Sequence, residues 1–156
     1  MKYLRYFESK KEITYLFLDI DGVFIPFDEV SNHRYFDEDD KWSKEAIKNL
    51  NTLYKKFNPI VVIISSYCNE KTVKEFQDKF KEMGFTGKIS DKLKNQKSDT
   101  RFSLVKKMIV KNDRFIIIDD MEHDIKDNAE LKINWCQPDS SKGFIKKDLD
   151  KCLNMI

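Results

Sequence analysis

The stretch "YLFLDIDGVFIPF", residues 15–27, decides the fold of this chain of 156 residues. Apart from its DIDG centre it consists almost wholly of large apolar residues, which is typical of a strand that is buried on both faces. Two carboxylates, Asp19 and Asp21, lie where this strand ends, and Gly22 follows them. Buried carboxylates cost free energy unless a cation or hydrogen bonds compensate them. The pair therefore indicates a functional site.

Helical patterns separate this run from two similar apolar runs further along the chain. The sequence predicts strands over residues 13–18, 60–64 and 115–118, a short fourth strand over 132–136, and helices over 43–57, 69–84, 98–112 and 146–153. Strands that alternate with helices predict an α/β fold, here a three-layer sandwich with a central, mainly parallel sheet of Rossmann-like type.

The composition favours one globular domain over residues 1–156, because 40% of the residues are hydrophobic and 36% are charged. A net charge of only +2 gives no support for a nucleic-acid-binding surface as the defining feature. The three cysteines share no CxxC spacing and predict free thiols in a reducing compartment. No apolar run approaches the ~20 residues of a membrane span, and the N-terminus lacks the apolar core of a signal peptide. We therefore expect a cytoplasmic protein with no membrane partner.

Polar residues follow each predicted strand at the edge where open parallel sheets bind ligands. Ser65 follows the second run, Asp119 and Asp120 follow the third, and Asp124 comes four residues later. Because a cluster of acids repels itself, we expect it to hold Mg²⁺, which takes carboxylate oxygens, water and substrate phosphate. One acid of the first pair can then attack phosphorus to give an aspartyl-phosphate. The other can protonate the leaving group and activate water.

Taken in order, these residues resemble the motifs of the haloacid dehalogenase (HAD) superfamily of phosphohydrolases. In this chain, "FLDIDGV" is similar to the first motif, "VVIISS" is similar to the second, and "FIIIDD" followed by Asp124 is similar to the fourth. The resemblance implies that Asp19 is the nucleophile and a metal ligand. It also implies that Asp21 is the general acid/base and binds the metal through its backbone carbonyl.

The same resemblance assigns the remaining site residues. It implies that Ser65 bonds a phosphoryl oxygen, and that Asp120 binds the metal directly with Asp119 and Asp124 in support. For the third motif, two bases at the start of the helix over 98–112 can hold the phosphate, and both are kept as candidates: Lys97, which precedes a helix capped by Ser98 or Asp99, and Arg101, which fits the K/R-x-x-x-I pattern of small members. Arginine occurs at only four positions in this lysine-rich chain, which slightly favours Arg101.

The spacing between the motifs predicts a HAD domain without a cap. Residues 22–42 leave room for a short flap, and residues 65–97 leave room for one helix and a short connector. Together with "PDSSKGFIKKDL" near the end of the chain, this resembles small capless HAD domains associated with RNA-repair proteins. The expected partner is a phosphorylated substrate, either a small molecule or the end of a nucleic acid. No pattern in the sequence assigns an oligomeric state.

The leading hypothesis is a Mg²⁺-dependent phosphatase that works through Asp19. A receiver-like phosphoacceptor uses the same residue types, but there an acidic pair comes first and a single acceptor follows. Here the candidate nucleophile precedes the late acidic pair, which favours the HAD order. A HAD-like domain that retains phosphate binding without catalysis is the remaining alternative, although every catalytic residue type is present.

Overall fold

A computed structural model describes residues 12–27, 36–94 and 98–156. Its centre is a five-stranded sheet of order β3-β2-β1-β4-β5, in which every pairing is parallel. The strands are β1 (Thr14–Leu18), β2 (Ile60–Ile63), β3 (Ile89–Lys92), β4 (Arg114–Ile118) and β5 (Trp135–Cys136). The predicted α/β fold with a parallel sheet is confirmed, and the strand quoted at the outset occupies its middle.

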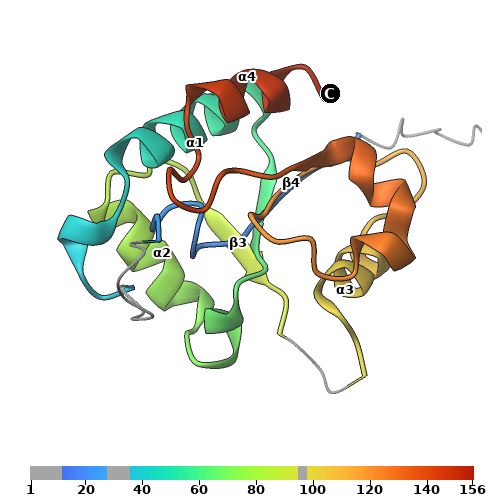
Figure 1. The fold of residues 1–156 in the computed structure, drawn as a ribbon, viewed down its shortest axis with the longest axis horizontal. Helices are drawn as coiled ribbons and strands as arrows, with labels where there is room; N and C mark the ends of the chain where they lie inside the picture. The colour runs from blue at the N-terminus through green and yellow to red at the C-terminus, as the bar shows by residue number, and fades with distance from the viewer. Residues whose placement is uncertain (1–11, 28–35, 95–97) are drawn as a thin grey trace, which may run out of the picture.

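Helices cover both faces of this sheet (Figure 1). On one face lie α1 (Lys44–Phe57), α2 (Val73–Glu82) and α4 (Lys146–Leu153), and on the other lie α3 (Arg101–Met108) and the 3-10 helix η3 (Ile125–Asn134). Two shorter 3-10 helices, η1 (Asp39–Lys41) and η2 (Ser66–Asn69), lie in the connections. None of the helices in the described ranges is both long and apolar enough to cross a membrane.

The strand β1 shows why the apolar runs do not alternate with polar residues. Leu16 and Leu18 belong to the core under α1, α2 and α4, whereas Phe17 belongs to the core under α3 and η3. Successive side chains of a strand point to opposite faces, so a strand with a core on each side needs apolar residues throughout.

The helices begin where local hydrogen bonding supports them. Ser43 caps α1 as expected, accepting a bond of 3.1 Å from the backbone of Ala46. The second helix begins later than predicted, because Thr72 and Glu75 form a capping box there. The third helix follows Thr100 rather than the expected caps at residues 98 and 99.

Two strands depart from the sequence-based expectation. The edge strand β3 was not predicted, because "ISDK" contains one apolar residue and only Ile89 is buried. The expected strand over 132–136 is reduced to β5, since the chain before Trp135 forms η3. Neither segment carries the apolar run that marks a doubly covered strand.

No separate cap domain occurs in the ranges that the structure describes, as the motif spacing predicts. Part of the predicted flap, residues 28–35, lies outside those ranges. The flap's described end packs into the core: Phe36 and Trp42 are buried, and Trp42 Nε1 donates a bond of 3.2 Å to Phe36 O. The flap is therefore anchored at this end by aromatic packing.

Candidate active site

The site begins where β1 and β4 end side by side. The two strands are in register at Leu18 and Ile118, so the next residues, Asp19 and Asp119, are also neighbours. Backbone bonds extend the sheet across this point, since Asp19 N donates to Ile118 O over 2.9 Å and Asp119 N donates to Cys136 O over 3.1 Å. Both carboxylates are consequently placed by the sheet itself.

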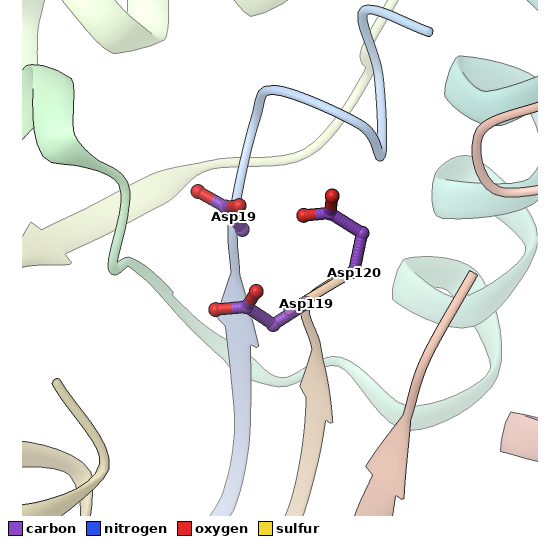
Figure 2. Close-up of side chains that lie close together, drawn as sticks. All are labelled: Asp19, Asp119 and Asp120. Atoms are coloured by element: carbon purple, nitrogen blue, oxygen red, sulfur yellow. The ribbon is translucent and has the colours of Figure 1, made fainter. Parts of the chain in front are cut away.

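Three carboxylates converge at this edge, and Figure 2 shows them turned toward one space beyond the strand ends. Asp19, Asp119 and Asp120 each offer an oxygen, and these oxygens lie within 4.8 Å of one another. Among the described residues, the buried Oδ1 of Asp120 has no hydrogen-bond partner. A hard divalent cation takes carboxylate oxygens of this kind, and the orphaned oxygen fits such an ion.

Gly22 brings Asp120 into this group. The chain after Asp19 folds into a tight turn in which Gly22 N donates to Ile25 O over 2.8 Å. Gly22 adopts a φ of +75°, which disfavours residues with a side chain, and a Cβ at this position would lie 2.5 Å from Asp120 Cγ and overlap its Oδ2. Glycine is therefore required for the turn and also for the approach of the Asp120 carboxylate.

The segment "PDSSKGF" near the end of the chain supports the same turn. Phe144 N donates to Val23 O over 2.8 Å, and Phe27 N donates to Ser140 O over the same distance. The two bonds fix the path of residues 23–27. This segment therefore holds the backbone that follows the first pair of acids.

Arg101 supplies positive charge to the acids. Its Nη1 lies 2.8 Å from Asp119 Oδ2 and 3.1 Å from Asp19 Oδ1, and its side chain is largely buried. Burial and the nearby Asp119 carboxylate raise the pKa of Asp19 well above its usual range, against the opposing effect of Arg101. Burial also raises the pKa of Asp120, again with a contribution from Asp119. The single positive charge of Arg101 does not balance the negative charges of three carboxylates. The site therefore favours the binding of a cation.

Asp119 is fully buried and serves as the hub of this arrangement. Besides the bond from Arg101, its Oδ1 accepts a bond of 2.9 Å from Met121 N. The imidazole Nε2 of His123 lies 3.2 Å from the same oxygen, and His123 adopts a φ of +42°. A histidine at position 123 does not by itself predict this contact in the sequence, because the contact depends on the left-handed turn after β4.

The structure does not bring Asp124 into the metal-compatible group, although the sequence assigned it a supporting role there. Its carboxylate instead accepts bonds from the backbone of Phe102 and Ser103, at 3.1 and 3.2 Å, and from the Thr100 hydroxyl. Burial alone would raise the pKa of Asp124, but these hydrogen bonds lower it. Asp124 thus satisfies the free N–H groups at the start of α3 and fixes the helix whose first residue is Arg101.

Tyr67 contacts both Asp21 and Ser65. It was not among the residues that the sequence predicts for the site. The Tyr67 hydroxyl donates to Asp21 Oδ1 over 3.1 Å, and the Ser65 hydroxyl oxygen accepts a bond of 3.3 Å from Tyr67 N. Ser65 is buried at the carboxyl end of β2, beside β1. Both side chains therefore belong to the same edge of the sheet as Asp19.

A cleft of about 550 Å³ opens beside Arg101 and is lined by Asp99, Thr100, Arg101, His123 and Asp124. None of the three converging acids lines this cleft, so it borders the site at Arg101. The other candidate base, Lys97, lies outside the described residues. The structure thus places Arg101 against the acids and leaves the choice between the two bases to experiment.

One comparison with known proteins gave a match. A family model described as "HAD domain in Swiss Army Knife RNA repair proteins" matches residues 15–149, which is most of the chain. Comparisons with curated proteins and with solved structures gave no match.

Proposed function

The chain belongs to the family of HAD domains in Swiss Army Knife RNA repair proteins, and from this membership we propose that it is a Mg²⁺-dependent phosphomonoester hydrolase. Membership of the HAD superfamily supports phosphohydrolase-type activity. The observation that carries the proposal is the convergence of Asp19, Asp119 and Asp120 beside Arg101, with a buried Asp120 oxygen that lacks a partner among the described residues.

In this proposal Asp19, Asp119 and Asp120 hold the cation, and the backbone carbonyl of Asp21 is a further candidate ligand. When bound, Mg²⁺ would neutralise the acids and polarise the phosphoryl group. Arg101 then faces the phosphoryl oxygens, and Ser65 donates its hydroxyl to one of them. The positive charge of Arg101 is retained because Asp19 and Asp119 outweigh the effect of burial and raise its pKa.

Asp19 is the proposed nucleophile. One of its carboxylate oxygens forms a bond to phosphorus while the bond from phosphorus to the leaving oxygen breaks, which gives an aspartyl-phosphate. Asp21 gives its proton to the leaving oxygen and then takes a proton from the water that hydrolyses the intermediate. Burial raises the pKa of Asp19, so Arg101, and Mg²⁺ when bound, would keep this carboxylate ionised for the attack.

The proposed substrate is the phosphorylated end of an RNA, with small phosphomonoesters as simpler substrates. The description of the matched family supports this choice. So does the fold, since the described residues include no cap domain that would exclude a polymer from the edge of the sheet.

The test measures phosphate release with Mg²⁺ from p-nitrophenyl phosphate, from an alkyl phosphate and from RNA oligonucleotides phosphorylated at the 5′ or the 3′ end. We expect the parent protein to turn over at least one RNA end, and Asp19→Asn to be inactive on every substrate because no aspartyl-phosphate can form. For Asp21→Asn, kcat/KM for the alkyl phosphate should fall by roughly 10²–10⁴-fold, which is the usual contribution of a general acid. Its kcat/KM for p-nitrophenyl phosphate should fall much less, because p-nitrophenolate leaves without a proton.

Two results would contradict the proposal. If the parent binds phosphate and Mg²⁺ but releases no phosphate from any substrate, the domain is a phosphate-binding module. If Asp19→Asn retains the parental rate, the nucleophile is another residue, and trapping with Mg²⁺ and beryllium fluoride identifies the residue that carries the phosphoryl mimic.

A further inference from the structure

The Tyr67 hydroxyl forms a hydrogen bond of 3.1 Å to one carboxylate oxygen of Asp21. The two residues lie on different segments, since Asp21 follows β1 and Tyr67 lies in η2 after β2. The bond links two loops beyond the strand pairing that already joins β1 to β2. Its position on the proposed acid/base suggests a functional role.

The backbone of Tyr67 is held in place by side chains on both sides. Ser65 bonds its backbone N–H, and Lys92, at the end of β3, reaches over the loop. Lys92 Nζ donates to Cys68 O over 2.9 Å and to Lys71 O over 2.6 Å. These bonds tie η2 to the neighbouring strand, so the loop that carries Tyr67 is rigid.

The ring of Tyr67 is also fixed. Tyr67 is only 2% exposed, and its ring centroid lies 5.1 Å from that of Phe36 at the described end of the flap. Phe36 in turn packs edge-on against Phe76 of α2, with the ring centroids 5.7 Å apart. Because both ring and backbone are held, the hydroxyl oxygen is fixed within hydrogen-bond distance of Asp21.

We propose that Tyr67 is a positioning residue for catalysis: it holds the Asp21 carboxylate in the rotamer from which Asp21 transfers a proton to the leaving oxygen. The inference rests on the proposed function and deepens it by adding a positioning residue to the proposed site. A bond to one carboxylate oxygen restricts the rotation of the whole planar group. Chemistry that depends on placement loses rate when a reacting group can rotate away.

If Tyr67 has this role, the loss of rate on removal of its hydroxyl should depend on the leaving group of the substrate. Proton donation matters most when the leaving oxygen is a poor leaving group, as in an alkyl phosphate, and least for p-nitrophenyl phosphate. Because kcat/KM for a covalent mechanism reports the steps up to formation of the aspartyl-phosphate, it isolates this transfer from the later attack of water.

The test is Tyr67→Phe, which removes one oxygen and keeps the ring. We expect kcat/KM to fall roughly 10- to 100-fold for the alkyl phosphate, a part of the ~10²–10⁴-fold that a general acid supplies, and less than about 3-fold for p-nitrophenyl phosphate. Tyr54→Phe is the matched control, since Tyr54 lies on α1 and packs against Phe85 with ring centroids 5.4 Å apart. It should change neither value. Phe36→Leu keeps the hydroxyl but loosens the packing that holds the Tyr67 ring, so it should lower stability and reduce kcat/KM more for the alkyl phosphate than for p-nitrophenyl phosphate.

An equal loss on both substrates in Tyr67→Phe would overturn the inference and leave Tyr67 a structural residue. A crystal structure of Tyr67→Phe provides a readout that needs no turnover: we expect the Asp21 side chain to leave its parental rotamer or to occupy several. If Asp21 keeps the parental rotamer alone, the inference is wrong. If the parent releases no phosphate, the proposed function fails, and the rotamer of Asp21 still decides the role of Tyr67.

Discussion

At the scale of single residues, Gly22 has two functions that the sequence shows only in part. Its positive φ lets the backbone turn after the first pair of acids, which a glycine after a strand suggests. The second function appears only in three dimensions, because the space that a side chain would fill is taken by the Asp120 carboxylate. A position that is small for two independent reasons tolerates no other residue without a loss.

We predict that Gly22→Ala lowers the free energy of unfolding by about 1–3 kcal/mol, from backbone strain and the clash with Asp120. It should also reduce the stabilisation by Mg²⁺, because Asp120 must move. The measurement is urea unfolding with and without Mg²⁺. Gly84→Ala is the matched control: Gly84 has a φ of +102°, but its Cβ would meet only Ile47, at 3.8 Å. If Gly84→Ala loses the Mg²⁺ response as well, the clash is not the cause.

At the scale of elements, the sequence predicts the parts of the fold that have a core on each side. The strands β1, β2 and β4 are apolar runs, and each was predicted to within a residue at either end. The edge strand β3 and the two-residue β5 carry no such run, so their pairing depends on neighbours that are distant in the chain. The boundaries of α2 and α3 also differed, because a capping box and a carboxylate from another segment set their first turns.

The candidate site likewise has a part that the sequence predicts and a part that it does not. The acids after β1 and β4 could be predicted to converge, because residue order and parallel pairing suffice for that. The contacts of Tyr67, Lys92 and His123 could not, since each depends on a loop conformation rather than on a motif. Asp124 shows the limit of motif matching: the residue is where the motif places it, but its carboxylate caps α3.

The element α3 presents Arg101 to the acids, which gives a test between the two candidate bases. We predict that Arg101→Ala lowers kcat/KM by at least 10²-fold, because a buried charge-assisted contact to the phosphoryl group is lost. Lys97→Ala, four residues earlier, should keep most of the activity. Circular dichroism of both variants checks that the fold is intact. The reverse pattern would move the phosphate-binding role to Lys97, and full activity in both would exclude both residues.

At the scale of the whole molecule, the cluster of acids proposed to bind the metal lowers the stability of the metal-free protein at neutral pH. Burial and mutual repulsion raise the pKa values of Asp19 and Asp120 in the folded protein. Between the ordinary value of 3.8 and these raised values, the folded state binds more protons than the unfolded state. Without a cation, the contribution of these groups to stability is therefore greatest at low pH and is lost as the pH rises through the raised pKa values.

We predict that Mg²⁺ reverses this trend. In EDTA, Asp120→Asn should be more stable than the parent at pH 7 and about as stable at pH 4, because the substitution removes one of the repelling charges. In millimolar Mg²⁺ the parent should gain stability by mass action, and the gain should grow with pH as the carboxylates ionise. Melting temperatures from pH 4 to 8 measure both effects. A Mg²⁺ shift that is independent of pH, or equal in Asp120→Asn, would contradict the proposed metal site.

The central place of β1 also has a consequence for how the protein is made. Tyr15 pairs with Ile60 on one side, whereas Thr14 pairs with Arg114 on the other. A ribosome that adds ~5–20 residues per second needs roughly 5–20 s to progress from the first strand to its later partner. Throughout that interval β1 has an unpaired edge, which is a template for association with other chains. Chaperone binding during translation is therefore expected to concentrate on the segment that carries the nucleophile.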